Sequence, residues 1–205
     1  PNLSDCYFSE EELPQSAAAD KSYFEPFIEL SPSKMEYVYL YVTDESGNPV
    51  KNITPELDDI FNQMADIMGR FDGIGLAGPQ VGLSQRIVII DAGTIATEDK
   101  LPPPPEKYMK IINPEIIEMS KETCVREEGC LSLPTIYYNV ERPCSIRVKY
   151  LNEKGEEIHL DATGLLARCI EHEIDHLNGK VFIDYVSPFK KRLAMSKLKK
   201  MKPTK

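Results

Sequence analysis

The sequence has no long hydrophobic run and few histidines, 3 in 205 residues. No stretch reaches the roughly 18 apolar residues that a membrane-spanning helix needs, so we expect no membrane partner. The first residues show neither a basic start followed by an apolar segment nor an Arg-rich, acid-poor composition. Those two patterns are typical of targeting segments. We therefore expect a soluble, untargeted protein.

Charge also limits the partners. The formal net charge is -9 and the sequence pI is near 5.0, which argues against a general nucleic-acid binder and against a specific DNA site. Only the last stretch, residues 190–205, is strongly basic, and it could contact an anionic surface. A solvated helix face is the simpler interpretation of that stretch.

Five cysteines occur at irregular spacing along the chain. An odd number without a regular pattern, in an acidic chain, fits a reducing compartment better than a disulfide framework. The sequence therefore predicts free thiols.

The length fits one well-buried core, and nothing in the sequence suggests two equal domains. We expect residues 1–50 to be an N-terminal extension packed on the domain, with a β-branched and aromatic strand at 37–42. Residues 51–205 are expected to form a single catalytic domain. It would end in a basic helix that begins at Ser187-Pro188.

Hydrophobic periodicity and turn residues predict an α+β protein with strands in runs and few helices. A helix is expected from Thr54-Pro55, with the threonine as its N-cap, to just before Asp72-Gly73. The proline-bearing segment 92–108 is expected to be a polar surface connection. Strands are expected at 86–90, 111–117, 123–126, 145–151 and 157–160.

The strongest signal is an HExxH pentapeptide at residues 172–176, inside a segment from 164 to 177 that has the pattern of one buried helix. At about 3.6 residues per turn, His172 and His176 lie one above the other, and Glu173 lies beside their face. Two imidazoles can hold a divalent ion while the carboxylate takes a proton from water, which is metal-assisted hydrolysis. The alternative is a helical pair of satisfied core histidines.

A hydrolytic site of this kind needs a third protein ligand. No Glu follows His176, and Phe182 stands where a metzincin pattern would need a histidine, so the ligand must come from upstream. Cys169 lies about 10.5 Å along the helix axis from His176, which is too far, and is better explained as a buried thiol. Cys130 stands apart because it sits in a tight, glycine-containing segment, 128–134. The full set of candidates is Cys124, Cys130, Cys144, Cys169 and His159.

Residues 73–80 form a glycine-dense loop, Gly-Ile-Gly-Leu-Ala-Gly-Pro-Gln. The loop lacks the Lys-Ser/Thr of a phosphate-binding loop and precedes a strand instead of a helix. Its glycines let the backbone approach an extended ligand closely, and Gln80 offers an amide.

Three ordered segments resemble the peptide deformylase family: residues 73–80, Glu-Gly-Cys-Leu-Ser at 128–132, and His-Glu-Ile-Asp-His at 172–176. The resemblance covers roughly residues 55–200. It implies antiparallel sheets surrounding a central HExxH-bearing helix. It also implies removal of the formyl group from the N-terminal formyl-methionine of newly made polypeptides, with release of formate. An endopeptidase and a non-enzymatic relative are the alternatives.

By this resemblance, Cys130, His172 and His176 would bind the metal, and Glu173 would be the general acid and base. The ion would be Fe2+ in the cell, whereas purified protein could hold Ni2+, Zn2+ or Co2+. Ligand type alone would favour zinc.

The resemblance also implies that Gln80 and the backbone N–H of Leu131 stabilise the negative oxygen that develops during the reaction. The ring of His172 would help to floor an apolar methionine pocket. Gly78 departs from the family pattern, which usually has alanine there, but this change removes no catalytic group. The expected substrate-binding residues are Ile74, Gly75, Gly129, Leu165 and Cys169.

Nascent formyl-methionyl polypeptides would be the partners. The basic C-terminal helix could also dock on ribosomal RNA near them, an expectation that rests on its charge. The setting would be a bacterial cytoplasm or, alternatively, an organelle after removal of a targeting segment.

Overall fold

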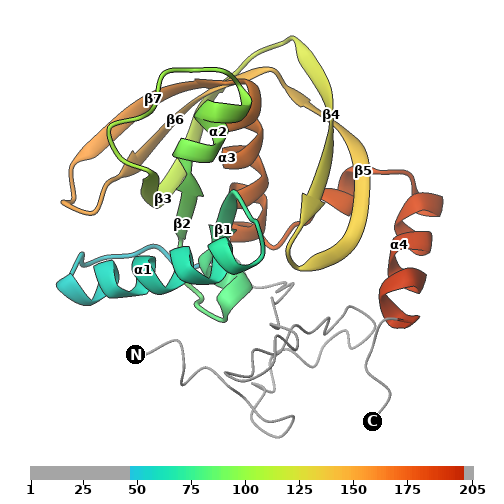
Figure 1. Ribbon diagram of the computed structural model, residues 1–205, viewed down its shortest axis with the longest axis horizontal. Helices are drawn as coiled ribbons and strands as arrows, with labels where there is room; N and C mark the ends of the chain where they lie inside the picture. Colours follow the sequence, from blue (N-terminus) through green and yellow to red (C-terminus); the bar gives the residue numbers. More distant parts are fainter. Residues whose placement is uncertain (1–46, 201–205) are drawn as a thin grey trace, which may run out of the picture.

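The computed structural model of the protein describes residues 47–200 (Figure 1). The strand expected at 37–42 lies outside the described residues, and the packing of the N-terminal extension stays a prediction. The helices are α1 (Pro55–Arg70), α2 (Ala92–Glu98), α3 (Gly164–Leu177) and α4 (Pro188–Lys200), with 3-10 helices η3 (Gly78–Val81) and η4 (Phe182–Tyr185). The strands are β1 (Gly75–Ala77), β2 (Ile87–Asp91), β3 (Tyr108–Met119), β4 (Thr123–Cys130), β5 (Leu133–Pro143), β6 (Ser145–Leu151) and β7 (Glu157–Thr163).

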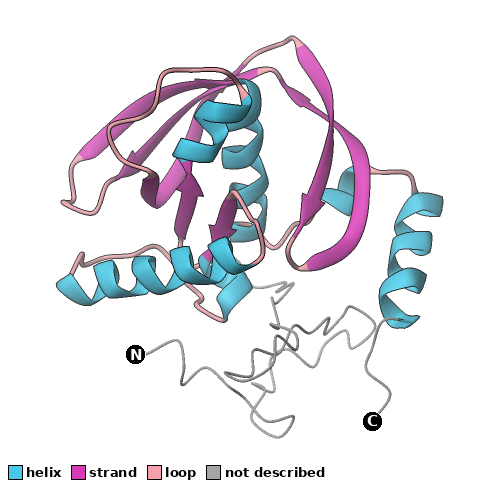
Figure 2. Cartoon of the chain, viewed as in Figure 1, coloured by secondary structure: helices cyan, strands magenta, loops and turns pink. Residues whose placement is uncertain are grey.

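The described strands form two antiparallel sheets. Five of them pair in the order β1-β2-β3-β6-β7, and β4 pairs with β5 in a separate two-stranded sheet. Helix α3 packs its apolar side chains against the larger sheet, and Arg168 on the same helix donates to backbone carbonyls of β4 and β5. The central helix between antiparallel sheets, expected from the sequence, is therefore confirmed (Figure 2).

Helix α3 is the most deeply buried of the described α-helices. All of its residues from Ala167 to Leu177 are buried, so its polar side chains lie inside the protein. It begins at Gly164, whose φ of +62° favours glycine. The next backbone N–H, at Leu165, donates to Asp99 Oδ2 at 2.8 Å. The predicted bounds of this helix, 164 to 177, are correct.

Helix α1 also begins where the sequence predicts. Thr54 is extended and Pro55 occupies the first turn, where its missing N–H costs nothing. The buried stripe of the helix packs onto β1 and β2. That stripe consists of Leu57, Ile60, Phe61, Met64, Ala65 and Met68.

Three helices or strands differ from the sequence-based expectation. Strand β1 forms inside the segment 73–80, which was expected to be a loop. The segment 92–108 is not a connection throughout, because α2 forms in it, capped by Asp91, which accepts from the N–H of Thr94. Strand β5 was not predicted at all. Its buried residues, Leu133, Ile136, Val140 and Arg142, do not follow a strict alternation, and its long pairing with β4 holds it extended.

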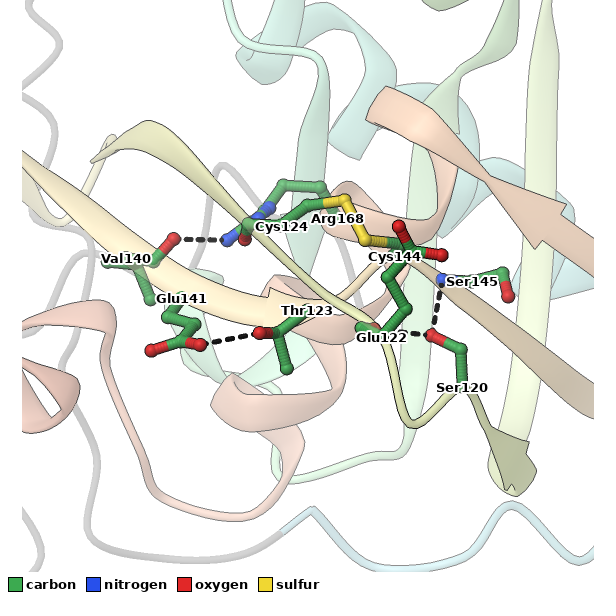
Figure 3. Close-up of a disulfide and its surroundings, with 9 residues drawn as sticks. All are labelled: Ser120, Glu122, Thr123, Cys124, Val140, Glu141, Cys144, Ser145 and Arg168. Carbon is green, nitrogen blue, oxygen red and sulfur yellow. Dashed lines mark hydrogen bonds between the residues drawn. A yellow bond between two sulfur atoms is a disulfide. The ribbon is translucent and has the colours of Figure 1, made fainter.

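The expectation of free thiols is wrong for Cys124 and Cys144, which form a disulfide (Figure 3). The β4–β5 register places Thr123 opposite Pro143, and this brings the two Cα atoms to 5.1 Å. The number and spacing of cysteines in the sequence do not show which of them strand pairing brings together. Cys130 and Cys169 are free, as expected.

Among the described helices, none is both long enough and apolar enough to cross a membrane.

Candidate active site

Three side chains that can ligate a metal converge where β4 meets α3. His172 and His176 lie one turn apart on α3, with ring centroids 5.0 Å apart. Cys130 comes from the end of β4, after an irregularity in the pairing at Gly129, and its Sγ lies 3.2 Å from Nε2 of His176. One ligand atom from each residue falls within 4.8 Å of the others.

This donor set fits a divalent transition metal, because one thiolate and two imidazoles are ligands that Zn2+ and Fe2+ accept. Burial works against ionisation of the Cys130 thiol, but the imidazoles of His176 and His172 outweigh it and hold the pKa of the thiol well below its ordinary value. Cys130, His172 and His176 together are called the metal cradle below. The cradle therefore supplies its sulfur atom in the charged form that a metal ion would bind.

Glu128 fixes the orientation of His172. Its Oε2 lies 2.9 Å from Nδ1 of His172, so Nε2 is the nitrogen left for a metal. Burial disfavours the charged carboxylate, yet hydrogen bonds from His172 and Arg142 prevail and keep the pKa of Glu128 well below its usual range. Arg168 also donates to its Oε1 at 2.9 Å.

The same network ties the β4–β5 hairpin to α3. Arg142 on β5 donates to Glu128 through Nε at 2.7 Å and to Asp175 Oδ2 through Nη1 at 2.7 Å. The hydroxyl of Tyr185 donates to Asp175 Oδ1 at 2.8 Å. Since Glu128 and Arg142 are both buried, these pairs are matched charges in a low-dielectric setting.

Replacing Glu128 with glutamine is expected to weaken metal binding by about 10–100-fold, the usual cost of losing an outer partner of a metal ligand. The amide keeps the shape but cannot accept from both His172 and the arginines. Competition with a chelator measures the affinity. Glu127→Gln, at the exposed neighbouring position, is the matched control, and equal affinities in the two variants would contradict the assigned role.

Glu173 lies beside the cradle with a free oxygen. Within the described part of the chain, its Oε2 has no hydrogen-bond partner although the side chain is buried. Burial raises the pKa of Glu173 to about 7, against the lowering effect of the two imidazoles. Such a carboxyl group can both accept and return a proton near neutral pH.

Gln80 is held by its own local structure. In η3 its Oε1 accepts from the backbone N–H of Ala77 at 2.8 Å. Its Nε2 donates to Ser132 Oγ at 3.0 Å and lies 3.6 Å from Cys130 Sγ. The amide N–H groups therefore point toward the cradle. Leu131, whose N–H has a role only by the family resemblance, directly follows Cys130 and is half-buried.

Of the five expected substrate residues, Ile74, Gly75 and Leu165 gather near Cys169. Sγ of Cys169 lies 3.6 Å from the carbonyl oxygen of Ile74, and Ile74 and Leu165 pack on the same core cluster as Cys169. At Gly75 a side-chain carbon would collide with Glu173 Oε1 and lie 2.7 Å from Cys169 Sγ. Only glycine lets β1 pass this close to Glu173.

Gly129 lies in the β4–β5 hairpin, next to Cys130. A side-chain carbon there would lie 2.5 Å from the ring of Tyr137, its partner across the hairpin. The remaining ligand candidates do not join the cradle. Cys124 and Cys144 are bonded to each other, and His159 is exposed beside Glu157.

Several residues of the site were not predicted. They are Glu128, Ser132, Arg142, Arg168, Asp175 and Tyr185. Glu128 could have been suspected from its place two residues before Cys130. Asp175 and Ser132 stand inside the quoted segments 172–176 and 128–132, and the sequence does not show that Arg142 and Arg168 are buried.

Comparisons with known proteins agree with this geometry. The model of the family "Polypeptide deformylase" matches residues 41–192. The chain is similar to peptide deformylase 1 of Burkholderia multivorans, with 45% identity over 155 residues, which is 76% of this chain and 81% of that protein. It is 41% identical over 172 residues to the peptide deformylase of Salinibacter ruber, covering 80% of this chain and 87% of that one.

Solved structures give the same result. The peptide deformylase of Ehrlichia chaffeensis in complex with actinonin superposes with a TM-score of 0.72 at 35% identity, covering 87% of this chain and 98% of that one. The enzyme of Synechococcus elongatus, also with actinonin, gives a TM-score of 0.68 at 40% identity, covering 76% and 82%. The chain therefore belongs to the polypeptide deformylase family.

Proposed function

We propose a division of roles within the site for the deformylase reaction. The reaction itself, hydrolysis of the formyl group of N-formyl-methionine peptides by a metal-dependent enzyme, follows from family membership. The observation that supports the roles most directly is the cradle of Cys130, His172 and His176 with the free oxygen of Glu173 beside it. When bound, the divalent ion polarises the formyl oxygen and makes water more acidic.

Glu173 moves the proton. Its Oε2 accepts a proton from the attacking water and then donates one to the leaving methionyl amine. Negative charge develops on the formyl oxygen meanwhile, and Nε2 of Gln80 and the backbone N–H of Leu131 donate to it. The hydrogen bond from Ala77 to Gln80 Oε1 fixes the amide beforehand, so little reorganisation is needed.

Ile74, Leu165 and Cys169 form the apolar surface for the methionine side chain, with the ring of His172 next to it. Gly75 on β1 and Gly129 on β4 would contribute backbone contacts to an extended peptide; at both, the missing side chain makes room for this chain's own Glu173, Cys169 and Tyr137. The described strands pair β1 with β2 only and β4 with β5 only, so each has one edge without a partner strand. A nascent N-terminus can therefore lie between these edges.

The metal in the cell is proposed to be Fe2+. Ni2+, Zn2+ or Co2+ can occupy the same thiolate and imidazole ligands in purified protein. The setting that we propose is a bacterial cytoplasm, where protein synthesis starts with formyl-methionine.

The test of the proposal is formate release from a formyl-Met tripeptide by protein prepared anaerobically with iron, beside the same peptide carrying an N-acetyl group. Release from the formyl peptide alone is expected, because the acetyl methyl group occupies space at the reacting carbon. No release from either peptide, with the metal shown to be bound, would overturn the proposal.

The basic helix α4 supports a second element of the proposal, docking on ribosomal RNA. Lys190, Arg192 and Lys197 are exposed on it, and the helix carries no acidic residue. Cations of this kind bind phosphate and release its counterions. The helix would then hold the site near emerging chains.

Reversing two of these charges, in Lys190→Glu with Arg192→Glu, is expected to reduce co-sedimentation with ribosomes and to flatten its dependence on salt. Turnover of a tripeptide should not change. Lys51→Glu with Lys121→Glu, at exposed positions elsewhere, makes the same change in net charge and is the control. Equal co-sedimentation of the two double variants would contradict docking through α4.

A further inference from the structure

The disulfide between Cys124 and Cys144 closes the base of the β4–β5 hairpin. Cys124 is the second residue of β4, and Cys144 stands between β5 and β6. Figure 3 shows the bond crossing between these segments. Cys124 is exposed and Cys144 is half-buried, so a small molecule in solution can reach the bond.

A chain of hydrogen bonds leads from this disulfide to the metal cradle. Arg168 Nη2 donates to the carbonyl oxygen of Cys124 at 2.6 Å (Figure 3). Its Nη1 donates to the carbonyl of Val140 at 2.9 Å and to Glu128 Oε1 at 2.9 Å. Glu128 in turn holds Nδ1 of His172. The guanidinium group of Arg168 is therefore bonded both to the backbone of Cys124 and to Glu128, the carboxylate that orients His172.

We propose that Cys124 and Cys144 form a reversible thiol–disulfide site for low-molecular-weight thiols, and that its oxidised form tightens the metal cradle. The proposal rests on the metal-binding roles given above to Cys130, His172 and His176. It adds a modification site that takes no part in the deformylase reaction itself.

The exchange proceeds in two steps. The thiolate of a small thiol attacks Sγ of the more exposed Cys124, a mixed disulfide forms, and Cys144 leaves as a thiolate. A second small thiol attacks the outer sulfur, so a small-molecule disulfide forms and Cys124 leaves as a thiolate. The protons of the two small thiols end on Cys124 and Cys144. Two small thiols are thereby oxidised and the protein disulfide is reduced, and the reverse reaction restores it.

Reduction removes the covalent tie at the hairpin base. Cys144 is then held there by the bond from its N–H to the carbonyl of Glu122 at 2.9 Å and by strand pairing, which frays most easily at an end. Once the carbonyl of Cys124 shifts, Arg168 can no longer satisfy its three acceptors in one position. Glu128 then holds His172 less firmly. Since full loss of such an outer partner costs about 10–100-fold in metal affinity, we expect about three- to tenfold faster metal release.

The test uses metal-loaded protein equilibrated anaerobically in mixtures of reduced and oxidised glutathione. Alkylation and mass analysis of the peptides that contain Cys124 and Cys144 give the redox state. Metal release to a chelator gives the rate, and hydrogen exchange of residues 123–130 gives the order of β4. The control is the double variant Cys124→Ser with Cys144→Ser, in which any remaining effect of thiol must come from Cys6, Cys130 or Cys169.

We expect Cys124 and Cys144 to be reduced together, with faster metal release and faster exchange in β4. The double variant should release metal at the fast rate in every mixture. Equal release rates of oxidised and reduced wild-type protein would overturn the proposal. So would thiols that stay free in every mixture, or a double variant that responds to thiol as the wild type does.

The route through Arg168 has its own variant. Arg168→Lys keeps the charge but cannot reach three acceptors at once, so the redox effect on metal release should fall below about twofold. An effect of unchanged size would overturn this route. A protein that bound no metal in either redox state would contradict the proposed function instead, and alkylation with hydrogen exchange would still decide whether the pair is a redox site.

Discussion

Replacing Glu173 with alanine is expected to lower kcat by about a hundred- to ten-thousandfold, the usual contribution of a positioned general acid and base, while the metal stays bound. The carboxyl group has a free oxygen, Oε2, and lies outside the set of ligand atoms that converge. Its loss therefore removes the proton carrier without removing a ligand. Metal content and kcat, measured on the same preparation, separate these two effects.

The variant Glu173→Gln distinguishes proton transfer from packing. Glutamine fills the same buried space but cannot accept and return a proton. If Glu173 only filled space between Gly75 and Cys169, glutamine would restore most of the turnover. We expect it to be nearly as inactive as alanine. Turnover close to that of the wild type in either variant would exclude the role given to Glu173.

Elements with strong local signals could be predicted from the sequence. Helix α1 begins at a threonine cap followed by proline, and α3 has an apolar pattern that continues through its polar residues. In both cases the signal lies within one element and repeats at helical spacing. The proposed metal ligands His172 and His176 could be recognised for the same reason.

Features that depend on pairing between distant segments could not be predicted. Cys124 and Cys144 meet because of the register of β4 on β5, and that register involves a strand whose sequence gives no alternating pattern. Arg142 and Arg168 look like surface residues in the sequence but are buried around Glu128. Burial of a charge is set by its partners in three dimensions, so sequence composition cannot show it.

Cys130 could be recognised as a candidate ligand from its glycine-containing segment and from the family resemblance. Its spacing from the histidines gave no signal. Cys130 lies 46 positions before His176, and no helical or strand period relates them. The fold closes this separation by placing the end of β4 against α3, with Cys130 Sγ 3.2 Å from Nε2 of His176.

Cys130→Ser is expected to weaken metal binding by more than about a hundredfold, since even partners outside the ligand set cost about 10–100-fold. A serine hydroxyl stays protonated at neutral pH and is a poor ligand, whereas the thiol of Cys130 ionises readily between its imidazoles. Metal analysis after desalting measures the loss. Cys169→Ser is the matched control, because Cys169 is the other free cysteine among residues 47–200 and serine keeps a donor toward the carbonyl of Ile74.

Thermal unfolding gives a second measure of the same loss. A metal that binds only the folded protein stabilises it by about 4 kcal/mol when present at about a thousand times its Kd. A chelator should therefore lower the Tm of the wild type and of Cys169→Ser by several degrees and leave the Tm of Cys130→Ser almost unchanged. If Cys130→Ser kept its metal and Cys169→Ser lost it, the ligand would be the buried thiol on α3. The proposed ligand set would then be wrong, and Cys169 would replace Cys130 in it.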